Sequence, residues 1–248
     1  MRATRAALAL LGLLAGTAPA LAQRACEALP PRNPPPAEAV PGPVPLDWWQ
    51  ARQRELEKLA GTDLSRVRML FLGDSLTQNW APPIFAQFYG HRAPLNMGIG
   101  SDTTQGLLWR LARSPLGGSL KPELVVLLIG TNNAHNPRSD EVATGIAEVV
   151  RLVRARSPGS RILLLGLYPR GASPQDPFRG SVQRINALIA GCASEAQRIT
   201  FLDPGPFLLD AAGNLSEAMA PDRLHLSAAG YAVIAMGIEW KLRELIGR

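Results

Sequence analysis

The sequence contains little cysteine, histidine or lysine. Its 248 residues include two cysteines, three histidines and three lysines, so nearly all of the 26 basic residues are arginine. Two cysteines cannot hold a disulfide-rich scaffold. Neither a Cys-x-x-Cys nor a His-x-x-x-His pair occurs, which argues against a zinc site. The formal charge of +6 is spread over single residues, without the basic runs of nucleic-acid-binding arms. We therefore expect no metal and no nucleic-acid partner.

Hydrophobic runs long enough to span a bilayer are also absent. A largely apolar stretch, AALALLGLLA (6–15), follows two arginines and precedes the small residues Ala20-Leu21-Ala22. Ten residues are too few to cross a membrane, and this order is typical of a secretory signal peptide. We predict a signal peptide over 1–22, export to the periplasm or the medium, and no stable membrane insertion after cleavage.

Proline is concentrated in one segment. Residues 30–45 read PPRNPPPAEAVPGPVP, with eight prolines in sixteen residues. That density excludes a helix and favours extended polyproline conformations. We expect residues 23–45 to form a linker or a strap, followed by one folded domain over 46–248.

Within the domain, short apolar runs alternate with apolar residues at helical spacing. Nearly continuous apolar runs are typical of strands buried on both faces of a parallel sheet. The candidate strands are Val67 to Leu72, Leu95 to Met97, Leu124 to Ile129, Arg161 to Leu165 and Ile199 to Leu202. Ser139 and Ser227 are plausible N-caps of two of the helices. The alternation predicts an α/β fold, a three-layer α/β/α sandwich with a parallel sheet of about five strands.

Four polar clusters stand where such a sheet would place a functional site. Three of them follow candidate strands: Gly73-Asp74-Ser75-Leu76, Asn96 to Thr104, and Gly130-Thr131-Asn132-Asn133. The fourth, Asp222-Arg223-Leu224-His225, precedes the last helix. Because the carboxyl ends of parallel strands lie at one edge of the sheet, these loops are expected to meet.

The residue types in these clusters fit acyl transfer. A serine hydroxyl such as that of Ser75 needs a neighbouring base, and His225 can serve because imidazole is mostly neutral at pH 7. Asp222 can accept from the other ring nitrogen and fix the tautomer. The Asn132 amide and backbone N–H groups around Ser75 and Gly100-Ser101 could stabilise an oxyanion. Each cluster alone could be an ordinary turn or helix cap, and the signal lies in their joint occurrence.

Together the clusters resemble the SGNH (GDSL) hydrolase family, which has a flavodoxin-like α/β/α fold. The matching blocks are LFLGDSL (70–76), NMGIGSDTT (96–104), IGTNN (129–133) and DRLH (222–225). Within the family, the pattern is most similar to the catalytic subunits of intracellular platelet-activating-factor acetylhydrolase. The resemblance implies a serine hydrolase that needs no cofactor, and it is much less specific for the substrate.

Carried over position by position, the resemblance makes Ser75 the nucleophile, His225 the base that Asp222 orients, and Asn132 a side-chain oxyanion donor. In the second block, relatives usually have glycine where this chain has Ser101. A serine can donate the same backbone N–H, at a cost of about 1 kcal/mol or more if the position requires φ > 0. Gly100 is the alternative donor if the register is shifted by one.

We expect an exported serine esterase that hydrolyses short-chain acyl esters, with acetyl as the first candidate, through an acyl-enzyme. Leu76 follows the nucleophile and Leu224 precedes the base, so both could limit the acyl pocket. The substrate would be a small-molecule or glycan ester. The alternatives are a lysophospholipase or thioesterase for longer chains and a catalytically silent glycan-binding module. A nucleotide-binding protein is disfavoured because no Gly-x-x-x-x-Gly-Lys-Ser/Thr loop is present.

The two cysteines allow two interpretations. Cys26 and Cys192 could form a disulfide that ties the proline-rich segment to the domain. Alternatively, Cys192 is simply buried on an apolar helix face while Cys26 stays unpaired. The sequence does not indicate an oligomeric state.

Overall fold

The computed structural model of the protein describes residues 25–247 and contains one sheet of five parallel strands. The strand order is β2-β1-β3-β4-β5. The strands are β1 (Met69–Gly73), β2 (Pro94–Asn96), β3 (Leu124–Leu128), β4 (Arg161–Leu165) and β5 (Ile199–Leu202). Every predicted strand is present. The continuous apolar runs of β1, β3 and β4 are buried in the sheet, whereas the edge strands β2 and β5 are largely half-buried.

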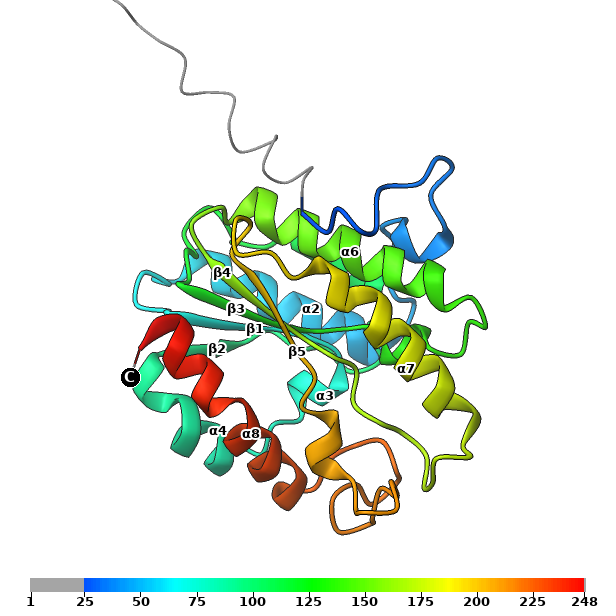
Figure 1. Cartoon of the computed structure of the whole chain (residues 1–248). Helices are drawn as coiled ribbons and strands as arrows, with labels where there is room; N and C mark the ends of the chain where they lie inside the picture. Colours follow the sequence, from blue (N-terminus) through cyan, green and yellow to red (C-terminus); the bar gives the residue numbers. More distant parts are fainter. Residues whose placement is uncertain (1–24, 248) are drawn as a thin grey trace, which may run out of the picture.

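Helices cover both faces of this sheet. Helices α6 and α7 lie on one face, and α4 and α8 lie on the other (Figure 1). The helices are α2 (Asp47–Lys58), α3 (Ser75–Gln78), α4 (Pro82–Tyr89), α5 (Thr104–Leu111), α6 (Ser139–Arg156), α7 (Pro177–Ile189) and α8 (Ala228–Ile246). The short 3-10 turns are η1 (Ala37–Ala39), η2 (Leu59–Gly61), η3 (Gly90–Arg92), η4 (Thr131–Asn133), η5 (Ala190–Cys192) and η6 (Gly205–Leu208). The predicted three-layer α/β/α fold is therefore confirmed.

The pairing of β1 with β3 brings two of the polar loops together. Gly73, the last residue of β1, pairs with Leu128, the last residue of β3. A Cβ atom on Gly73 would lie 2.1 Å from the Leu128 carbonyl oxygen, so only glycine fits there. The loops after these two strands consequently leave the sheet side by side.

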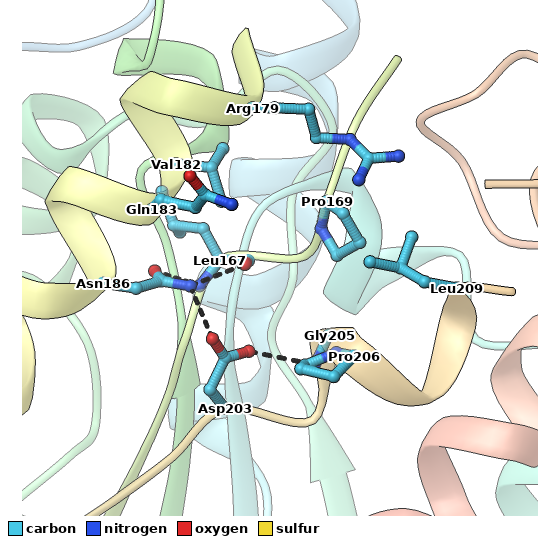
Figure 2. Close-up of a pocket in the computed structure, with 10 residues that line it drawn as sticks. All are labelled: Leu167, Pro169, Arg179, Val182, Gln183, Asn186, Asp203, Gly205, Pro206 and Leu209. Carbon is cyan, nitrogen blue, oxygen red and sulfur yellow. Dashed lines mark hydrogen bonds between the residues drawn. The ribbon is translucent and has the colours of Figure 1, made fainter. Parts of the chain in front are cut away.

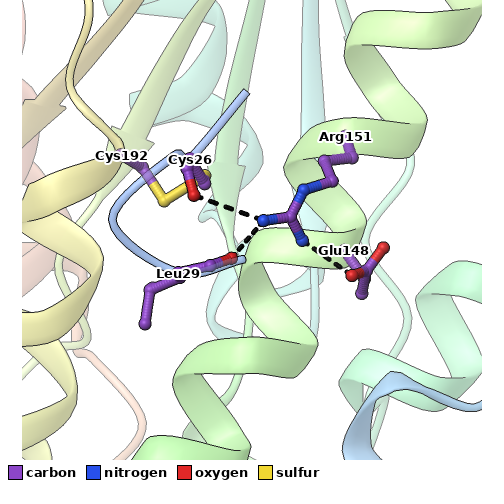
Figure 3. Close-up of a disulfide and its surroundings, with 5 residues drawn as sticks. All are labelled: Cys26, Leu29, Glu148, Arg151 and Cys192. Atoms are coloured by element: carbon purple, nitrogen blue, oxygen red, sulfur yellow. Dashed lines mark hydrogen bonds and ion pairs between the residues drawn. A yellow bond between two sulfur atoms is a disulfide. The ribbon is translucent and has the colours of Figure 1, made fainter. Parts of the chain in front are cut away.

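The proline-rich segment lies against the domain as a strap. Cys26 forms a disulfide with Cys192, and Ala25 and Leu29 are buried. The Arg151 guanidinium of α6 donates to the carbonyl oxygens of Cys26 and Leu29 (Figure 3). The strap interpretation therefore fits residues 25–45 better than a free linker, and the two cysteines are paired.

The predicted signal peptide, 1–22, falls outside the described residues. Within residues 25–247, no helix combines the length and apolar character needed to cross a bilayer.

Candidate active site

Ser75 lies at the junction of β1 and α3. It is the first residue of α3, and Asp74 caps that helix by accepting from the Leu76 N–H at 2.9 Å. Ser75 is 8% exposed, and its Oγ lies 3.0 Å from His225 Nε2. The serine is thus fixed by a capped turn and lies within hydrogen-bonding distance of a base.

His225 is held from the other side by Asp222. The distance from Nδ1 to Asp222 Oδ2 is 2.7 Å. Asp222 Oδ1 accepts from the backbone N–H groups of Leu224 at 3.0 Å and His225 at 2.7 Å, which fixes the carboxylate. With Nδ1–H donating to Asp222, the Nε2 lone pair faces the serine hydroxyl. Burial tends to raise the pKa of Asp222, but the hydrogen bonds from His225 and Leu224 outweigh burial and lower it.

The second polar loop holds Ser101 in the left-handed region. Its φ is +63°, a conformation that favours glycine, which accounts for the glycine usual at this position in the family. The neighbouring Gly100 N–H donates to Gln78 Oε1 at 2.5 Å. Of the two candidate backbone donors, Gly100 is therefore already engaged within the chain.

Asn132 lies in η4, directly after β3. Its Nδ2 donates to the backbone carbonyl oxygen of Asp102 at 2.8 Å, which links the third polar loop to the second. An amide nitrogen carries two hydrogens, so this bond fixes the amide plane and leaves one hydrogen for another acceptor. A further link joins Thr104 N–H to Asn133 Oδ1 at 3.0 Å. All four predicted polar clusters therefore take part in one connected arrangement.

Asp74, next to the nucleophile, is fully buried. Its Oδ2 has no hydrogen-bond partner, and burial raises its pKa to about 7. The charge of Asp102 raises this pKa further, while the Leu76 N–H and the Arg110 charge lower it. The carboxyl group therefore changes protonation state close to neutral pH.

The two predicted acyl-pocket residues differ in exposure. Leu76 is buried in the core, whereas Leu224 is partly exposed beside the base. Within residues 25–247, no group of three or more His, Cys, Asp or Glu side chains is arranged to hold a metal ion.

Several residues of this arrangement were not singled out in the sequence. Gln78 accepts from Gly100, and the ion pair of Arg110 with Asp102 lies behind the second loop. Arg170 Nη1 donates to the Thr131 carbonyl oxygen at 3.1 Å, at the base of the Asn132 turn. A sequence signal existed for Arg110, because it is a charged residue within the otherwise apolar stretch LLWRL (107–111).

A separate small pocket lies beside α7 and η6 (Figure 2). Its polar groups bind one another: Asn186 donates to the Leu167 carbonyl oxygen and to Asp203, and Asp203 accepts from Gly205 N–H. None of Ser75, Asp222 and His225 lines it. The pocket is therefore distinct from the residues predicted to be catalytic.

Comparison with curated proteins gives close relatives over most of the chain. The sequence is 36% identical to platelet-activating factor acetylhydrolase IB subunit alpha1 of Bos taurus, over 72% of this chain and 76% of the relative. It is 35% identical to subunit alpha2 of Homo sapiens, over 72% of this chain and 77% of the relative.

These relatives correct the predicted location. They are subunits of an intracellular acetylhydrolase, and this contradicts our prediction of an exported, periplasmic or secreted protein. The prediction depended on residues 1–22, which resemble a signal peptide by pattern alone.

Solved structures share the fold. A GDSL-like lipase from Bacteroides thetaiotaomicron superimposes with a TM-score of 0.61 at 22% identity, covering 79% of this chain and 97% of that one. The acetylxylan esterase Axe2 from Geobacillus stearothermophilus gives a TM-score of 0.56 at 22% identity, covering 75% and 97%. Residues 71–233 match the model of the GDSL-like lipase/acylhydrolase family, a range that includes all four polar clusters. The chain therefore belongs to the GDSL-like lipase/acylhydrolase family and is an ester-bond hydrolase.

Proposed function

We propose that this chain is a serine esterase that removes short acyl groups, acetyl first, from small-molecule or glycan esters. The observation that carries the proposal is the chain of contacts from Ser75 Oγ to His225 Nε2, at 3.0 Å, and from His225 Nδ1 to Asp222 Oδ2, at 2.7 Å. Nucleophile, base and orienting carboxylate are the three roles that serine-dependent acyl transfer requires.

In the proposed reaction, Ser75 Oγ attacks the ester carbonyl carbon while His225 Nε2 takes the hydroxyl proton. Asp222 stabilises the imidazolium that forms and keeps its own negative charge. His225 then gives the proton to the leaving alcohol, and the acyl group remains on Ser75. A water molecule, deprotonated by His225, then attacks this acyl-enzyme. The bond between the acyl carbon and Ser75 Oγ breaks, the acid is released, and His225 returns the proton to Ser75 Oγ.

The carbonyl oxygen becomes negatively charged in both halves of the reaction. We assign its stabilisation to the Asn132 amide and the backbone N–H of Ser101. Asn132 is supported as a donor by the bond that fixes its amide plane on Asp102. Ser101 is supported by its left-handed conformation and by the engagement of the neighbouring Gly100 N–H with Gln78. Donors fixed before the reaction need no reorganisation when the charge develops.

The preference for acetyl is supported by two sources. The curated relatives are named acetylhydrolases, and one structural neighbour is named an acetylxylan esterase. In addition, Leu224 lies directly before the base and is partly exposed, where a branched side chain would restrict acyl length, whereas Leu76 is buried in the core. Leu224 is the more accessible of the two.

The test compares p-nitrophenyl acetate, butyrate, octanoate and palmitate as substrates, with Ser75→Ala as the control. We expect the highest kcat/KM for acetate and loss of more than about 99% of the activity in Ser75→Ala, because removing a triad nucleophile is severe. Leu224→Ala should raise the rate on octanoate relative to acetate.

Other results would favour the alternatives. A maximum at eight carbons or longer would indicate a lysophospholipase or thioesterase. No hydrolysis of any ester, together with retained binding of glycans, would indicate a silent binding module. If the acetyl preference holds, product analysis with acetylated polysaccharides and small acetyl esters would identify the alcohol.

A further inference from the structure

A buried ion pair lies directly behind the proposed oxyanion donors. Arg110 Nε donates to Asp102 Oδ2 at 2.7 Å, and the two side chains are 2% and 0% exposed. Removing two charges from water costs several kcal/mol per ion, and a buried pair is often no more stabilising than well-packed apolar residues. A gain in stability is therefore a weak explanation for this buried ion pair, and its contacts indicate a different role.

The pair connects three of the four loops that carry the proposed catalytic groups, namely those after β1, β2 and β3. Arg110 Nη2 donates to the carbonyl oxygen of Gly73, two residues before Ser75, at 3.0 Å. Asp102 directly follows Ser101, and its own backbone carbonyl accepts from Asn132 Nδ2 at 2.8 Å. A displacement of Asp102 would therefore move the Ser101 backbone and turn the Asn132 amide together.

The Asp102 carboxylate is fixed from a second direction as well. Trp49 of α2 is buried, and its Nε1 donates to Asp102 Oδ1 at 3.0 Å. The Thr103 N–H donates to the same oxygen at 3.1 Å. A Cβ atom at Gly106 would lie 2.1 Å from this oxygen, so the chain leaves just enough room for the carboxylate. Both carboxylate oxygens are thus engaged, and α2 is connected to the site.

We propose that Asp102, Arg110 and Trp49 are positioning residues that set the geometry of the oxyanion donors. They do not touch the substrate, and they act through Asn132 and the Ser101 N–H. Oxyanion donors lose much of their effect when they are misplaced by a fraction of an ångström, because their contribution depends on prior alignment. The inference rests on the proposed esterase function and deepens it.

A double-mutant cycle separates positioning from a merely structural role. The two perturbing variants are Arg110→Lys, which keeps the charge but loses the fork that bridges Asp102 and Gly73, and Trp49→Phe, which removes only the indole donor. Each is measured in the wild-type and in the Asn132→Ala background on p-nitrophenyl acetate.

We expect Arg110→Lys to lower kcat by roughly tenfold or more while KM stays within about threefold, because the oxyanion forms only after binding. Trp49→Phe should lower kcat by a smaller factor. In the Asn132→Ala background the further loss from either variant should shrink to about threefold or less, since the group through which it acts is already gone.

Arg92→Lys is the matched control. Arg92 is also buried and forms a two-bond pair with Glu239, both bonds at 2.8 Å. It precedes β2, at the amino edge of the sheet, whereas the proposed site lies at the carboxyl edge. The Arg92→Lys substitution should lower the melting temperature without lowering kcat. If Arg110→Lys does not fold, Trp49→Phe decides the question.

The outcomes distinguish this inference from the proposed function. Unchanged kcat in Trp49→Phe and Arg110→Lys, or losses that simply multiply with that of Asn132→Ala, would overturn the positioning role. Activity retained in Ser75→Ala would instead overturn the proposed function.

Discussion

At the scale of single residues, Asn132 is the side chain whose removal tests the oxyanion site most directly. Asn132→Ala should lower kcat by roughly 10² to 10³, which corresponds to about 2.7 to 4 kcal/mol, because it removes a donor that matters once charge develops. KM should change less, since the uncharged carbonyl of the bound ester holds this donor only weakly. Steady-state kinetics on p-nitrophenyl acetate measure both. A rise in KM at constant kcat would assign Asn132 to substrate binding instead.

For Ser101 we expect the opposite result, because its substitution by glycine should cause little loss of activity. Its φ of +63° costs a residue with a Cβ atom about 1 kcal/mol or more, a cost that glycine does not have. Ser101→Gly keeps the backbone N–H, so activity should stay within about tenfold of the wild type. Stability should change little, because relief of strain is offset by the greater freedom of glycine in the unfolded chain.

A loss of activity in Ser101→Gly comparable to that of Asn132→Ala would contradict this assignment. It would mean that the hydroxymethyl group itself takes part in the reaction or holds the loop in place. Thermal unfolding of the same variant separates these two explanations.

At the scale of secondary-structure elements, we expect the stability of the junction of β1 and α3 to depend on pH. Burial raises the folded-state pKa of Asp74 to about 7, above the ordinary aspartate value of 3.8. The folded protein therefore holds this proton more tightly than the unfolded chain. The free energy of unfolding should fall as pH rises from about 4 to about 7. The protonated Asp74 carboxyl group therefore contributes to stability at low pH, and this contribution is lost as the pH approaches 7.

Asp74→Asn should remove this dependence, because the amide imitates the protonated carboxyl group and its oxygen can still accept from Leu76. Between pH 5 and pH 8, the variant should gain up to about 3 kcal/mol relative to the wild type. Urea unfolding at several pH values measures the difference. Asp176→Asn controls for loss of a capping charge, since Asp176 caps α7 with the same 2.9 Å bond but is partly exposed. Parallel pH profiles for Asp74→Asn and the wild type would contradict the buried titration.

Elements with a strong local signal could be predicted, and those decided by neighbouring contacts could not. β1, β3 and β4 match because a continuous apolar run has few alternatives to burial in a sheet. Ser227 caps α8 as expected, accepting from Gly230 N–H at 3.1 Å. Ser139 does not cap α6. The Asn136 side chain accepts from Arg138 N–H and turns the chain earlier, so α6 begins at Ser139 itself.

The candidate site also divides into residues with a local sequence signal and contacts that depend on neighbouring elements. The motif gives residue types and spacing, from which Ser75, Asn132, Asp222 and His225 were predicted as site residues. It does not give orientation. The engagement of Gly100 by Gln78 and the bonds of Arg110 to two loops exist only after α3 and α5 have packed on the sheet.

At the scale of the whole molecule, the disulfide joins the start of the strap to the far end of α7. Cys26 and Cys192 are 166 residues apart, so the bond closes most of the chain into one loop. Cross-linking over such a distance restricts the unfolded state strongly, and loss of a native disulfide typically costs about 2 to 5 kcal/mol. Cys192 lies between α7 and β5, at the amino edge of the sheet, whereas the loops that carry Ser75, Ser101 and Asn132 lie at the carboxyl edge.

The double variant Cys26→Ser, Cys192→Ser should therefore lose stability but keep its activity. We expect the melting temperature to fall by roughly 10 °C, while kcat at 25 °C stays within about twofold, because the strap's anchor is remote from Ser75. A reductant should lower the melting temperature of the wild type and leave that of the variant unchanged. A wild type that is insensitive to reductant would show that the covalent bond adds nothing beyond the buried contacts of Ala25 and Leu29. A large fall in kcat would show instead that the strap supports the catalytic loops, through the bond from Thr104 Oγ1 to the Glu38 carbonyl oxygen, 2.7 Å long.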